Sequence, residues 1–375
     1  MPVKDENRSF ILKCTRECNF ACSYCTDKKR ADSSLPLDAM IGFVKNAVDG
    51  STAQRTKFIF HGGEPLLLGT DYFLKILYLQ SLCNARGTIL NVIQSNASLI
   101  SPEWIEFLRQ HNIQLGISLD GPPESNDKFR RYALGGATSM DVIANIQALN
   151  EANVLFGILC VVSDVLIDCG AERVFQFFCD LQVSRVGFLP LRVPQIQFQN
   201  QAKASEFYEY RQRYATFMCE MYRLWIAHDD PTFKIRELES ILNILVGGVP
   251  NLCVFSGPCV GRIFGVDSNG TIAHCDKFFH DDNFCFGNLA ETTIDDILMS
   301  EKFARAQEYD ALARQQCASC DWFSACRGGC LKDAVLFQTT NLGDRKSYCH
   351  LKIIFDCISN HLVNSGIALR FCNEK

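Results

Sequence analysis

The cysteines of this 375-residue chain are the residues with the clearest chemical potential, because there are 20 of them and many are clustered. The N-terminal segment Met1–Arg8 is polar and charged, so it does not predict a secretory signal peptide. A chain of this length also does not need disulfide bonds to fold. In a reducing compartment, clustered cysteines indicate metal or redox chemistry. We therefore expect a cytoplasmic protein that carries metal centres.

The first cluster has the spacing Cys18-x3-Cys22-x2-Cys25, with Tyr24 directly before the last cysteine. Three thiolates on one loop can hold three irons of a [4Fe–4S] cluster and leave the fourth iron open to a ligand. Cys14 lies outside this register, because a Cys-x3-Cys-x2-Cys pattern that began at Cys14 would need a cysteine at position 21, which is Ala. The alternative interpretation is a zinc knuckle or a group of buried thiols. Structural zinc sites normally pair two knuckles of two ligands, which a compact triplet does not match.

The segment Cys18–Cys25 is similar to the signature of the radical S-adenosylmethionine superfamily, and further motifs follow in the order of that family. His61–Pro65 resembles its GGEP motif, which receives the amine of the cofactor, and Ser118–Gly121 resembles the segment that meets the ribose. Each of these later motifs is weak alone, since such residues also form ordinary turns and caps. Taken together, the motifs resemble those of the family. This resemblance implies that the residues binding S-adenosylmethionine are Tyr24, Gly62, Gly63, Glu64, Pro65, Asn96, Ser118, Asp120 and Arg130.

The second cysteine group lies between residues 253 and 349 and resembles a SPASM domain of peptide-modifying radical enzymes. Eight thiolates suffice for two fully ligated [4Fe–4S] clusters. By similarity, the first auxiliary cluster would take Cys253, Cys259, Cys275 and Cys330, and the second would take Cys317, Cys320, Cys326 and Cys349. Spacing alone equally permits a local set of four from Cys317 to Cys330, and a zinc ribbon is a further alternative. The other nine cysteines are expected to be packing residues, with the role of Cys285 left open.

Short apolar runs alternate with amphipathic segments through the first half of the chain, which predicts parallel βα units. The predicted strands are Ser9–Cys14, Lys57–His61, Ile89–Gln94, Gln114–Leu119, Leu155–Val162 and Ser184–Leu189. The predicted helices between them are Leu37–Val48, Asp71–Leu82, Pro102–His111, Ser139–Ala152 and Ala171–Leu181. Six units are two short of a full barrel, so we expect an α/β fold with a partial (β/α)6 TIM-type barrel. The motif residues then gather where the strands end, the edge at which barrel enzymes assemble their sites.

The pattern changes after residue 191 and gives three predicted regions. Residues 1–195 form the radical S-adenosylmethionine barrel. Residues 196–249 form a helical linker, with a loop at Gln195–Ala204 and helices at Lys203–Ile226 and Phe233–Val246. Residues 250–375 form the SPASM domain with its two auxiliary clusters and a C-terminal helix. Up to residue 349 this last region looks irregular apart from a hairpin at Ile263–His274, so we expect cluster binding to contribute its folding energy.

The resemblance implies an enzyme with S-adenosylmethionine and three [4Fe–4S] clusters, one of them at the cofactor site. A 5′-deoxyadenosyl radical would abstract a hydrogen from an inert carbon of the substrate. Asp276, next to Cys275, matches the candidate base of anaerobic sulfatase maturases; a solvated turn aspartate is the alternative. The favoured function is oxidative modification or crosslinking of a side chain of a ribosomal peptide, because Ser125–Arg130 looks more like enzymes that crosslink or cyclise such peptides.

Two alternatives retain radical chemistry: oxidation of Cys or Ser to formylglycine, as in the sulfatase maturases, and dehydrogenation of a small molecule. A zinc-rich binding module is a third. The chain departs from the maturases at His61, where they typically have Gln, and at Gln94-Ser95-Asn96-Ala97, where they typically have Gln-Thr-Asn-Gly. The role of His61 stays open.

The expected partners are a peptide or protein substrate, with or without a leader peptide, and an electron donor of the flavodoxin or ferredoxin type. The formal net charge of −5 gives no reason to expect nucleic-acid binding. An apolar run of about 18 residues would be needed for a membrane span, and the sequence contains none.

Overall fold

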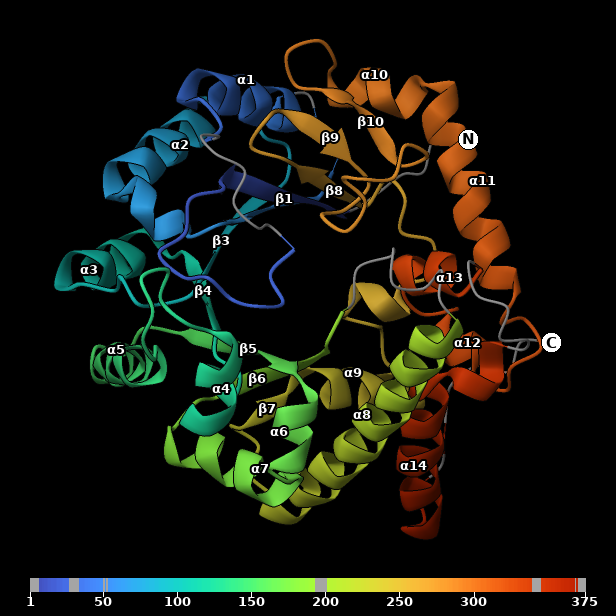
Figure 1. Cartoon of the computed structure of the whole chain (residues 1–375). Helices are drawn as coiled ribbons and strands as arrows, with labels where there is room; N and C mark the ends of the chain where they lie inside the picture. The colour runs from blue at the N-terminus through green and yellow to red at the C-terminus, as the bar shows by residue number, and fades with distance from the viewer. Residues whose placement is uncertain are drawn as a thin grey trace. The chain divides into compact units, whose positions relative to one another are not determined.

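The computed structural model describes residues 7–26, 34–49, 51, 53–192, 201–338, 345–367 and 369. The chain forms two compact units that alternate along the sequence (Figure 1). The first unit comprises Met1–Ser118, Arg130–Phe156 and Val260–Tyr309, and the second comprises Leu119–Phe129, Gly157–Cys259 and Asp310–Lys375.

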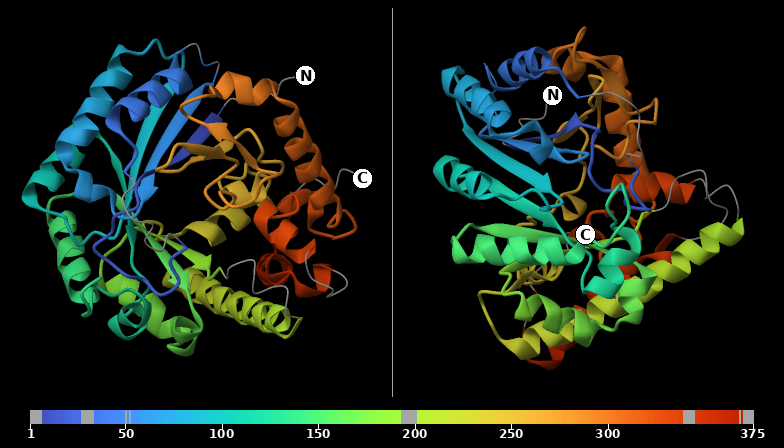
Figure 2. Two further views of the ribbon diagram at one scale, coloured as in Figure 1. Left: turned by 45° about the horizontal axis from the view of Figure 1, so that its top comes forward. Right: turned by 60° about the vertical axis from the view of Figure 1, so that its left-hand side comes forward.

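The first unit is built on a sheet in which the strand order is β10-β9-β8-β1-β2-β3-β4. Its parallel strands are β1 (Asn7–Thr15), β2 (Arg55–Gly62), β3 (Thr88–Ser95), β4 (Gln114–Ser118) and β8 (Ile263–Val266), and its antiparallel strands are β9 (Thr271–Ala273) and β10 (Cys285–Asn288). Helices α1 (Leu37–Val48) and α2 (Thr70–Leu82) lie along one face of the blue strands in Figure 2. This unit also contains α3 (Pro102–His111), α5 (Ser139–Glu151) and α10 (Ile294–Met299).

Aromatic side chains from neighbouring strands form the core of this sheet. Phe10 is fully buried and stacks on Phe58 of β2 and Phe264 of β8, with ring centroids 5.6 and 5.7 Å apart. Such stacked pairs add to the free energy gained from apolar burial. The core therefore joins β8, from the C-terminal half of the sequence, to the first two strands.

The second unit contains the parallel strands β5 (Phe156–Val162), β6 (Arg185–Pro190) and β7 (Lys234–Ile235). Its helices before the cysteine-rich region are α4 (Pro123–Phe129), α6 (Asp164–Asp168), α7 (Ala171–Asp180), α8 (Gln201–His228) and α9 (Arg236–Leu245). Two tyrosines of α8 hold it to strand carbonyls: the hydroxyl of Tyr210 donates to Val162 O at 2.5 Å, and that of Tyr214 donates to Phe188 O at 2.8 Å.

The cysteine-rich part of the second unit consists of short elements. These are η3 (Cys253–Phe255), α12 (Phe323–Cys326), α13 (Leu331–Gln338), η4 (Arg345–Tyr348) and the longer α14 (His350–Asn364), which packs against α8. Helix α11 (Glu301–Gln315) begins in the first unit and ends in the second.

The six predicted strands and the five helices between them are confirmed, with bounds within two residues of the prediction. Ser101 caps the start of α3, since its hydroxyl accepts a hydrogen bond from Trp104 N at 3.3 Å. The hairpin is confirmed as β8 and β9, whose turn is closed by Gly270 N donating to Asp267 O at 2.9 Å.

Two sequence expectations need correction. The expected loop Gln195–Ala204 lies partly outside the described residues, and its last four residues belong to α8. The region after residue 250 is less irregular than expected, because it contains the 15-residue helix α11. The buried face of α11 includes Phe303 and Ala306 but also the charged Asp310 and Arg314. An apolar stripe interrupted by an ion pair gives no helical hydrophobic periodicity, so the sequence could not indicate this helix.

Within the described ranges, none of the helices combines the length and the apolar character needed to cross a membrane.

Candidate functional site

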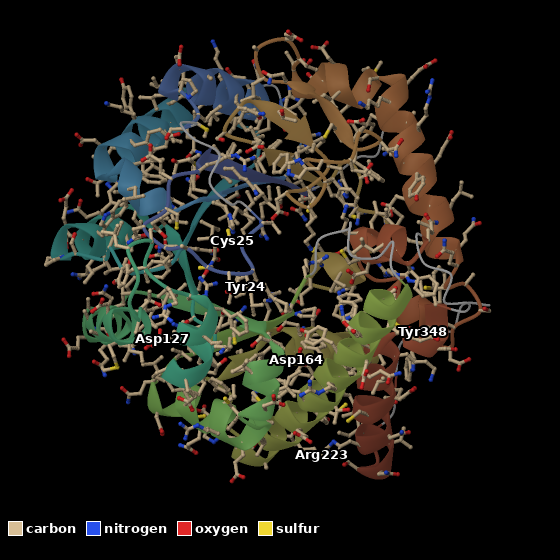
Figure 3. All side chains as sticks on the ribbon, viewed as in Figure 1. Tyr24, Cys25, Asp127, Asp164, Arg223 and Tyr348 are labelled. Atoms are coloured by element: carbon tan, nitrogen blue, oxygen red, sulfur yellow. The ribbon has the colours of Figure 1, made fainter. Side chains whose placement is uncertain are left out.

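The cysteine triplet lies on the loop that follows β1 in the first unit; Figure 3 labels Tyr24 and Cys25 on it. The three cysteines are half-buried, and they lie near enough to influence one another. Burial, reinforced by Glu64, Cys22 and Cys25, raises the pKa of Cys18 to about 11. Thiolates packed this closely need a positive partner to be stable, and the iron of a cluster would supply it.

Backbone hydrogen bonds tie this loop to the segment after Arg130. Ala21 N donates to Arg131 O at 2.7 Å, and Ala133 N donates to Asn19 O at 2.8 Å. The loop is thus held at both sides of Phe20, which also contacts Tyr132 edge to face.

The fully buried Glu64 joins the loop after β2 to the end of β3. One carboxylate oxygen accepts from Ser95 Oγ at 2.7 Å and from Leu66 N at 3.1 Å, and the other accepts from Asn96 N at 2.7 Å. Burial raises the pKa of Glu64 to about 6, although these hydrogen bonds and the charge of Arg130 oppose the rise. Glu64 therefore fixes the predicted cofactor loop at residues 62–65 against the neighbouring strand end.

Two glycines let this loop pass against the backbone of the cysteine loop. Gly62 has φ +120°, and a Cβ there would lie 2.3 Å from Thr15 O. A Cβ on Gly63 would lie 1.8 Å from Glu17 O. Gly63 N and Glu64 N donate to Thr15 O and Glu17 O at 2.7 Å, so the two loops are also hydrogen-bonded. The glycines are therefore required by close backbone approach.

We expect Gly63→Ala to destabilise this junction by about 3 kcal/mol, because the overlap is with backbone that cannot rotate away. Binding of S-adenosylmethionine, measured by calorimetry on the reconstituted protein, should be lost. Gly42→Ala is the matched control, since Gly42, like Gly63, does not have a positive φ, and a Cβ there would meet nothing within 4 Å. Equal affinity of the Gly63→Ala and Gly42→Ala variants would contradict the packing argument.

The remaining predicted cofactor residues of the first unit gather around the same strand ends. The guanidinium carbon of Arg130 lies 5.6 Å from the ring of Tyr24, and Arg130 Nη1 is 4.0 Å from Cys22 Sγ. Asn96 Nδ2 donates to Asn19 Oδ1 at 2.8 Å and lies 4.0 Å from Cys18 Sγ.

Two further candidates are held by strand ends of different units. Ser118 Oγ, at the end of β4, accepts from Gln94 Nε2 at 3.0 Å. Asp120 belongs to the second unit, where its carboxylate accepts from Val161 N at 2.9 Å. The roles of both in binding the ribose stay predictions.

Cys275 and Asp276 form a tight turn that rests on β8. Cys275 has φ +78°, and its thiol donates to Asp276 Oδ1 at 3.0 Å. The turn lies so close to β8 that a Cβ on Gly265 would be 2.8 Å from Asp276 N. Both residues are half-buried, which differs from the solvated turn that was the alternative for Asp276.

Cationic side chains surround the carboxylate of Asp276. Burial is the largest influence and would raise its pKa, but Lys277, the Cys275 thiol, His61 and Lys13 together hold the pKa below its usual value. Lys13 is buried and also lies 5.1 Å from the ring centroid of Phe279. Asp276 is therefore a carboxylate at neutral pH and can accept a proton. The sequence singled out His61 without a role, and gave no signal for Lys13.

A buried ion pair connects the cysteine loop to the β8–β9 hairpin. Arg16 pairs with Asp267, and Arg16 Nε donates to Ser268 Oγ at 3.2 Å. Their side chains are 5% and 3% exposed, so each charge depends on the other. This pair fixes the loop of the triplet relative to the hairpin that leads to Cys275. No sequence signal indicated this pair, because its two residues are 251 positions apart.

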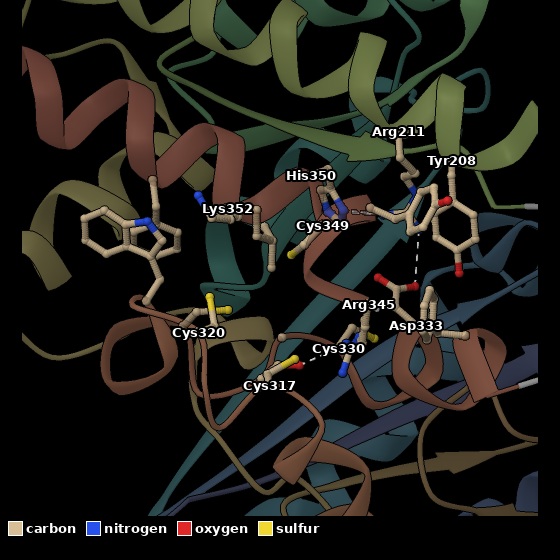
Figure 4. A pocket seen from close by; sticks show the side chains of 18 of the residues that line it. Tyr208, Arg211, Cys317, Cys320, Cys330, Asp333, Arg345, Cys349, His350 and Lys352 are labelled. Atoms are coloured by element: carbon tan, nitrogen blue, oxygen red, sulfur yellow. Dashed lines mark hydrogen bonds and ion pairs between the residues drawn. The ribbon is translucent and has the colours of Figure 1, made fainter. Parts of the chain in front are cut away.

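In the second unit, four predicted ligands of one auxiliary cluster line a single cavity (Figure 4). Burial raises the pKa of Cys326 to about 12, and its thiol neighbours Cys349, Cys317 and Cys320 reinforce the rise. Cys330 also lines the cavity, and it reinforces the raised pKa of Cys259, a predicted ligand of the other cluster. The arrangement thus favours the set completed by the remote Cys349 over the local set of four.

The charges lining this cavity fit an anionic cluster. Arg211 and Arg345 both line it, and Arg211 Nε and Arg345 Nη1 are buried donors without a hydrogen-bond partner in the described part of the chain. Four thiolates around a [4Fe–4S] core carry net negative charge, which two guanidinium groups would stabilise. The residues present therefore fit an iron–sulfur cluster.

Three of the four predicted ligands of the other auxiliary cluster also lie together in the second unit. Burial raises the pKa of Cys259, with Cys330 and Cys253 among the neighbours that reinforce the rise. The fourth predicted ligand, Cys275, belongs to the first unit, so its part in this set stays a prediction.

The zinc alternatives require side chains that converge on one ion. Among the described residues, no three His, Cys, Asp or Glu side chains lie close enough together to hold a single metal ion. A zinc site needs its sulfurs about 2.3 Å from one centre, whereas a cubane spreads them around a larger core. The preference for clusters over zinc rests on the cysteine spacing in the sequence.

Comparison with known families agrees with this chemistry. Residues 12–177 match the family model of the radical SAM superfamily, and residues 258–321 match that of the SPASM iron–sulfur cluster-binding domain. The chain therefore contains a radical SAM domain followed by a SPASM domain. These matches confirm the predicted α/β fold with a cysteine-rich SPASM region, and they imply S-adenosylmethionine and iron–sulfur clusters as cofactors.

The radical SAM/SPASM chain is similar to two kinds of sulfatase-maturating enzyme over most of its length. The serine-type anaerobic enzyme of Bacteroides thetaiotaomicron is 26% identical, over 84% of this chain and 80% of the relative. The cysteine-type anaerobic enzyme of Clostridium perfringens (strain 13 / Type A) is 27% identical, over 92% of this chain and 95% of the relative. The predicted resemblance to these maturases is confirmed.

A solved structure described as native anSMEcpe with bound AdoMet and Cp18Cys peptide has the same fold. The TM-score is 0.81 at 24% identity, and the alignment covers 95% of this chain and 98% of the other. At this identity the similarity shows the fold of the radical SAM/SPASM chain and nothing further.

The ligand assignment predicts a selective loss of iron. We expect Cys349→Ala to lower the iron content of anaerobically reconstituted protein from about twelve to about eight atoms per chain, because one cluster loses a ligand. Cys357→Ala, on helix α14, which begins directly after Cys349, lies outside the cavity lining and should retain full iron. Full iron content in the Cys349→Ala variant would contradict the assignment.

Proposed function

We propose that this enzyme oxidises a Cys or Ser side chain of a peptide or protein to formylglycine, as an anaerobic sulfatase-maturating enzyme. The observation that carries this proposal is similarity to both serine-type and cysteine-type maturases over 84 to 92% of the chain, well beyond the two matched domains. These relatives support the formylglycine alternative of the sequence analysis better than the crosslinking of a ribosomal peptide.

We assign three [4Fe–4S] clusters to the ligand sets inferred from the sequence. When bound to the triplet, a reduced cluster with S-adenosylmethionine supplies a 5′-deoxyadenosyl radical. The chain's own residues bind and orient that cofactor. Glu64 fixes the glycine loop against β3, and Arg130 lies beside Tyr24 and the triplet, where its charge can meet the carboxylate of the cofactor.

Asp276 has the properties of the base for this reaction. It is a half-buried carboxylate, and Lys277, His61 and Lys13 favour its ionised form. After the carbon of the substrate has lost a hydrogen atom to the radical, Asp276 would take up the proton of the thiol or hydroxyl, and the remaining electron would pass to an auxiliary cluster. A Ser side chain becomes the aldehyde directly, whereas a Cys side chain becomes a thioaldehyde that water converts to the aldehyde with release of hydrogen sulfide. A base placed next to a cluster ligand lets the proton and the electron leave together, which avoids a charged intermediate.

The partners follow from the same proposal. The anSMEcpe structure carries a Cys-containing peptide by its description, which supports a peptide segment as the substrate here. We also assign a donor of the flavodoxin or ferredoxin type and a cytoplasmic location, on the strength of the sequence alone.

The test uses three peptides that contain a sulfatase active-site segment with Cys, Ser or Ala at the target position. The anaerobically reconstituted enzyme is supplied with S-adenosylmethionine and a reductant, and the products are analysed by mass spectrometry and by trapping of the aldehyde with a hydrazide. We expect aldehyde from the Cys or the Ser peptide and none from the Ala peptide.

A different product would overturn the proposal. If 5′-deoxyadenosine forms but no peptide yields an aldehyde, formylglycine formation is refuted. A product that has lost two hydrogens and carries a bond between an aromatic ring and a neighbouring β-carbon would establish the crosslinking alternative.

A further inference from the structure

Two arginines of the second unit donate to sulfurs that belong to the same predicted cluster. Arg314 Nη2 lies 3.4 Å from Cys259 Sγ, and Arg192 Nη2 lies 3.7 Å from Cys330 Sγ. Each arginine is paired with an aspartate, Asp310 at 2.6 Å and Asp333 at 3.2 Å respectively. Two guanidinium groups thus face one ligand set, and neither is part of the site motifs.

The two arginines differ in what else they support. Arg314 is only 4% exposed, and its Nη1 also donates to the carbonyls of Arg327 and Gly329, so it holds the fold of this loop. Arg192 is 32% exposed and follows the end of β6. The preceding residue anchors it, because Leu191 N donates to the hydroxyl of Tyr210 at 2.6 Å. Arg192 can therefore be changed with less risk to folding.

Asp333 holds the guanidinium of Arg192 in place from α13. Its Oδ1 also accepts from Arg211 Nη2 at 3.2 Å, and Arg211 Nη1 lies 3.1 Å from His350 Nε2 (Figure 4). Arg211 is 3% exposed, so Asp333 is fixed from the buried side and presents its carboxylate to Arg192. The geometry of Arg192 on Cys330 is thus set by a rigid partner.

A hydrogen bond from a cationic donor to a ligand sulfur stabilises the more negative, reduced state of an iron–sulfur cluster. Residues that contact the ligands are known to set redox properties in this way. The effect is directional, because removal of the donor makes the cluster harder to reduce.

We propose that Arg192, held by Asp333, raises the reduction potential of the cluster that Cys330 ligates and thereby makes this cluster the better acceptor of one electron from the substrate. The inference rests on the ligand assignment of the proposed function, but not on the identity of the substrate.

The test is a potentiometric titration followed by electron paramagnetic resonance, on reconstituted holoenzyme without S-adenosylmethionine or peptide. We expect Arg192→Met to retain the wild-type iron content while one midpoint potential moves to a more negative value. Arg192→Lys keeps the charge but loses the planar geometry, so it should give a smaller shift in the same direction.

Two comparisons make the result specific. Arg213→Met removes an arginine of α8 that is 41% exposed and pairs with Asp164 and Asp168, and it should leave every potential unchanged. In a Cys330→Ala background, where the affected cluster is missing, adding Arg192→Met should shift nothing.

Unchanged potentials in Arg192→Met would overturn the proposal, and so would loss of iron, which would make Arg192 an assembly residue. The titration contains no peptide, so its result does not depend on the substrate. If Arg192→Met shifts a potential but the enzyme forms no formylglycine in the separate peptide assay, this inference stands and only the proposed function is refuted.

Discussion

Replacement of Cys18, Cys22 and Cys25 together by Ala is expected to abolish formation of 5′-deoxyadenosine, down to the level seen without enzyme. The three thiols share one loop and lie near one another, so together they are the predicted ligands of a single cluster. Without them the reductive cleavage of S-adenosylmethionine has no site at which to occur. The product is quantified by chromatography after incubation with reductant, and iron should fall from about twelve to about eight atoms per chain.

Cys14→Ala is the matched control for the triplet. Cys14 precedes the same loop, but it is fully buried in β1, and burial raises its thiol pKa so that it stays protonated. We expect this variant to keep cofactor cleavage and full iron content. Continued 5′-deoxyadenosine formation by the triple variant would show that the cofactor site lies elsewhere in the chain.

Asp276→Asn is expected to leave cleavage of S-adenosylmethionine largely intact while product formation falls by about 100-fold or more. General bases typically contribute about 10²- to 10⁴-fold to rate, and the amide keeps the shape of the side chain without its basicity. The measurement is the ratio of 5′-deoxyadenosine to modified peptide, which should rise from near unity because cleavage becomes uncoupled from oxidation.

Asp282→Asn provides the control for this variant, because Asp282 is an exposed carboxylate six positions further along the same segment. It should leave both products unchanged. Unchanged turnover in Asp276→Asn would remove Asp276 from the mechanism. Loss of both products would instead make it a structural residue of the turn on β8.

Much of the fold could be predicted because its signals are local. Each strand of the first half is a short apolar run next to an amphipathic helix, and the observed bounds differ from the predicted ones by at most two residues. Helix α11 was missed for the opposite reason. Its buried face contains Asp310 and Arg314, and a sequence pattern cannot show that two charges will neutralise each other inside a core.

The same distinction applies to the site: some of its residues are neighbours in the sequence, and others come together only in the fold. The register of Cys18, Cys22 and Cys25 follows from a single loop, so the sequence alone determined that these thiols act together. Sequence spacing could not decide whether Cys330 or Cys349 completes the set with Cys326, because both are compatible with it. The cavity in the second unit favours Cys349, from the start of α14.

Tertiary structure alone decided the environment of the charged residues. It places Lys13 and His61 of adjacent strands near Asp276, and it pairs Arg16 with Asp267 and Arg192 with Asp333 and Cys330. The partners in each case lie far apart in the sequence, and their interaction depends on burial and distance. The cysteine spacing therefore determined which chemistry this protein carries, while packing decided which side chains can tune it, because electrostatic effects depend on distance through space and exclusion of water.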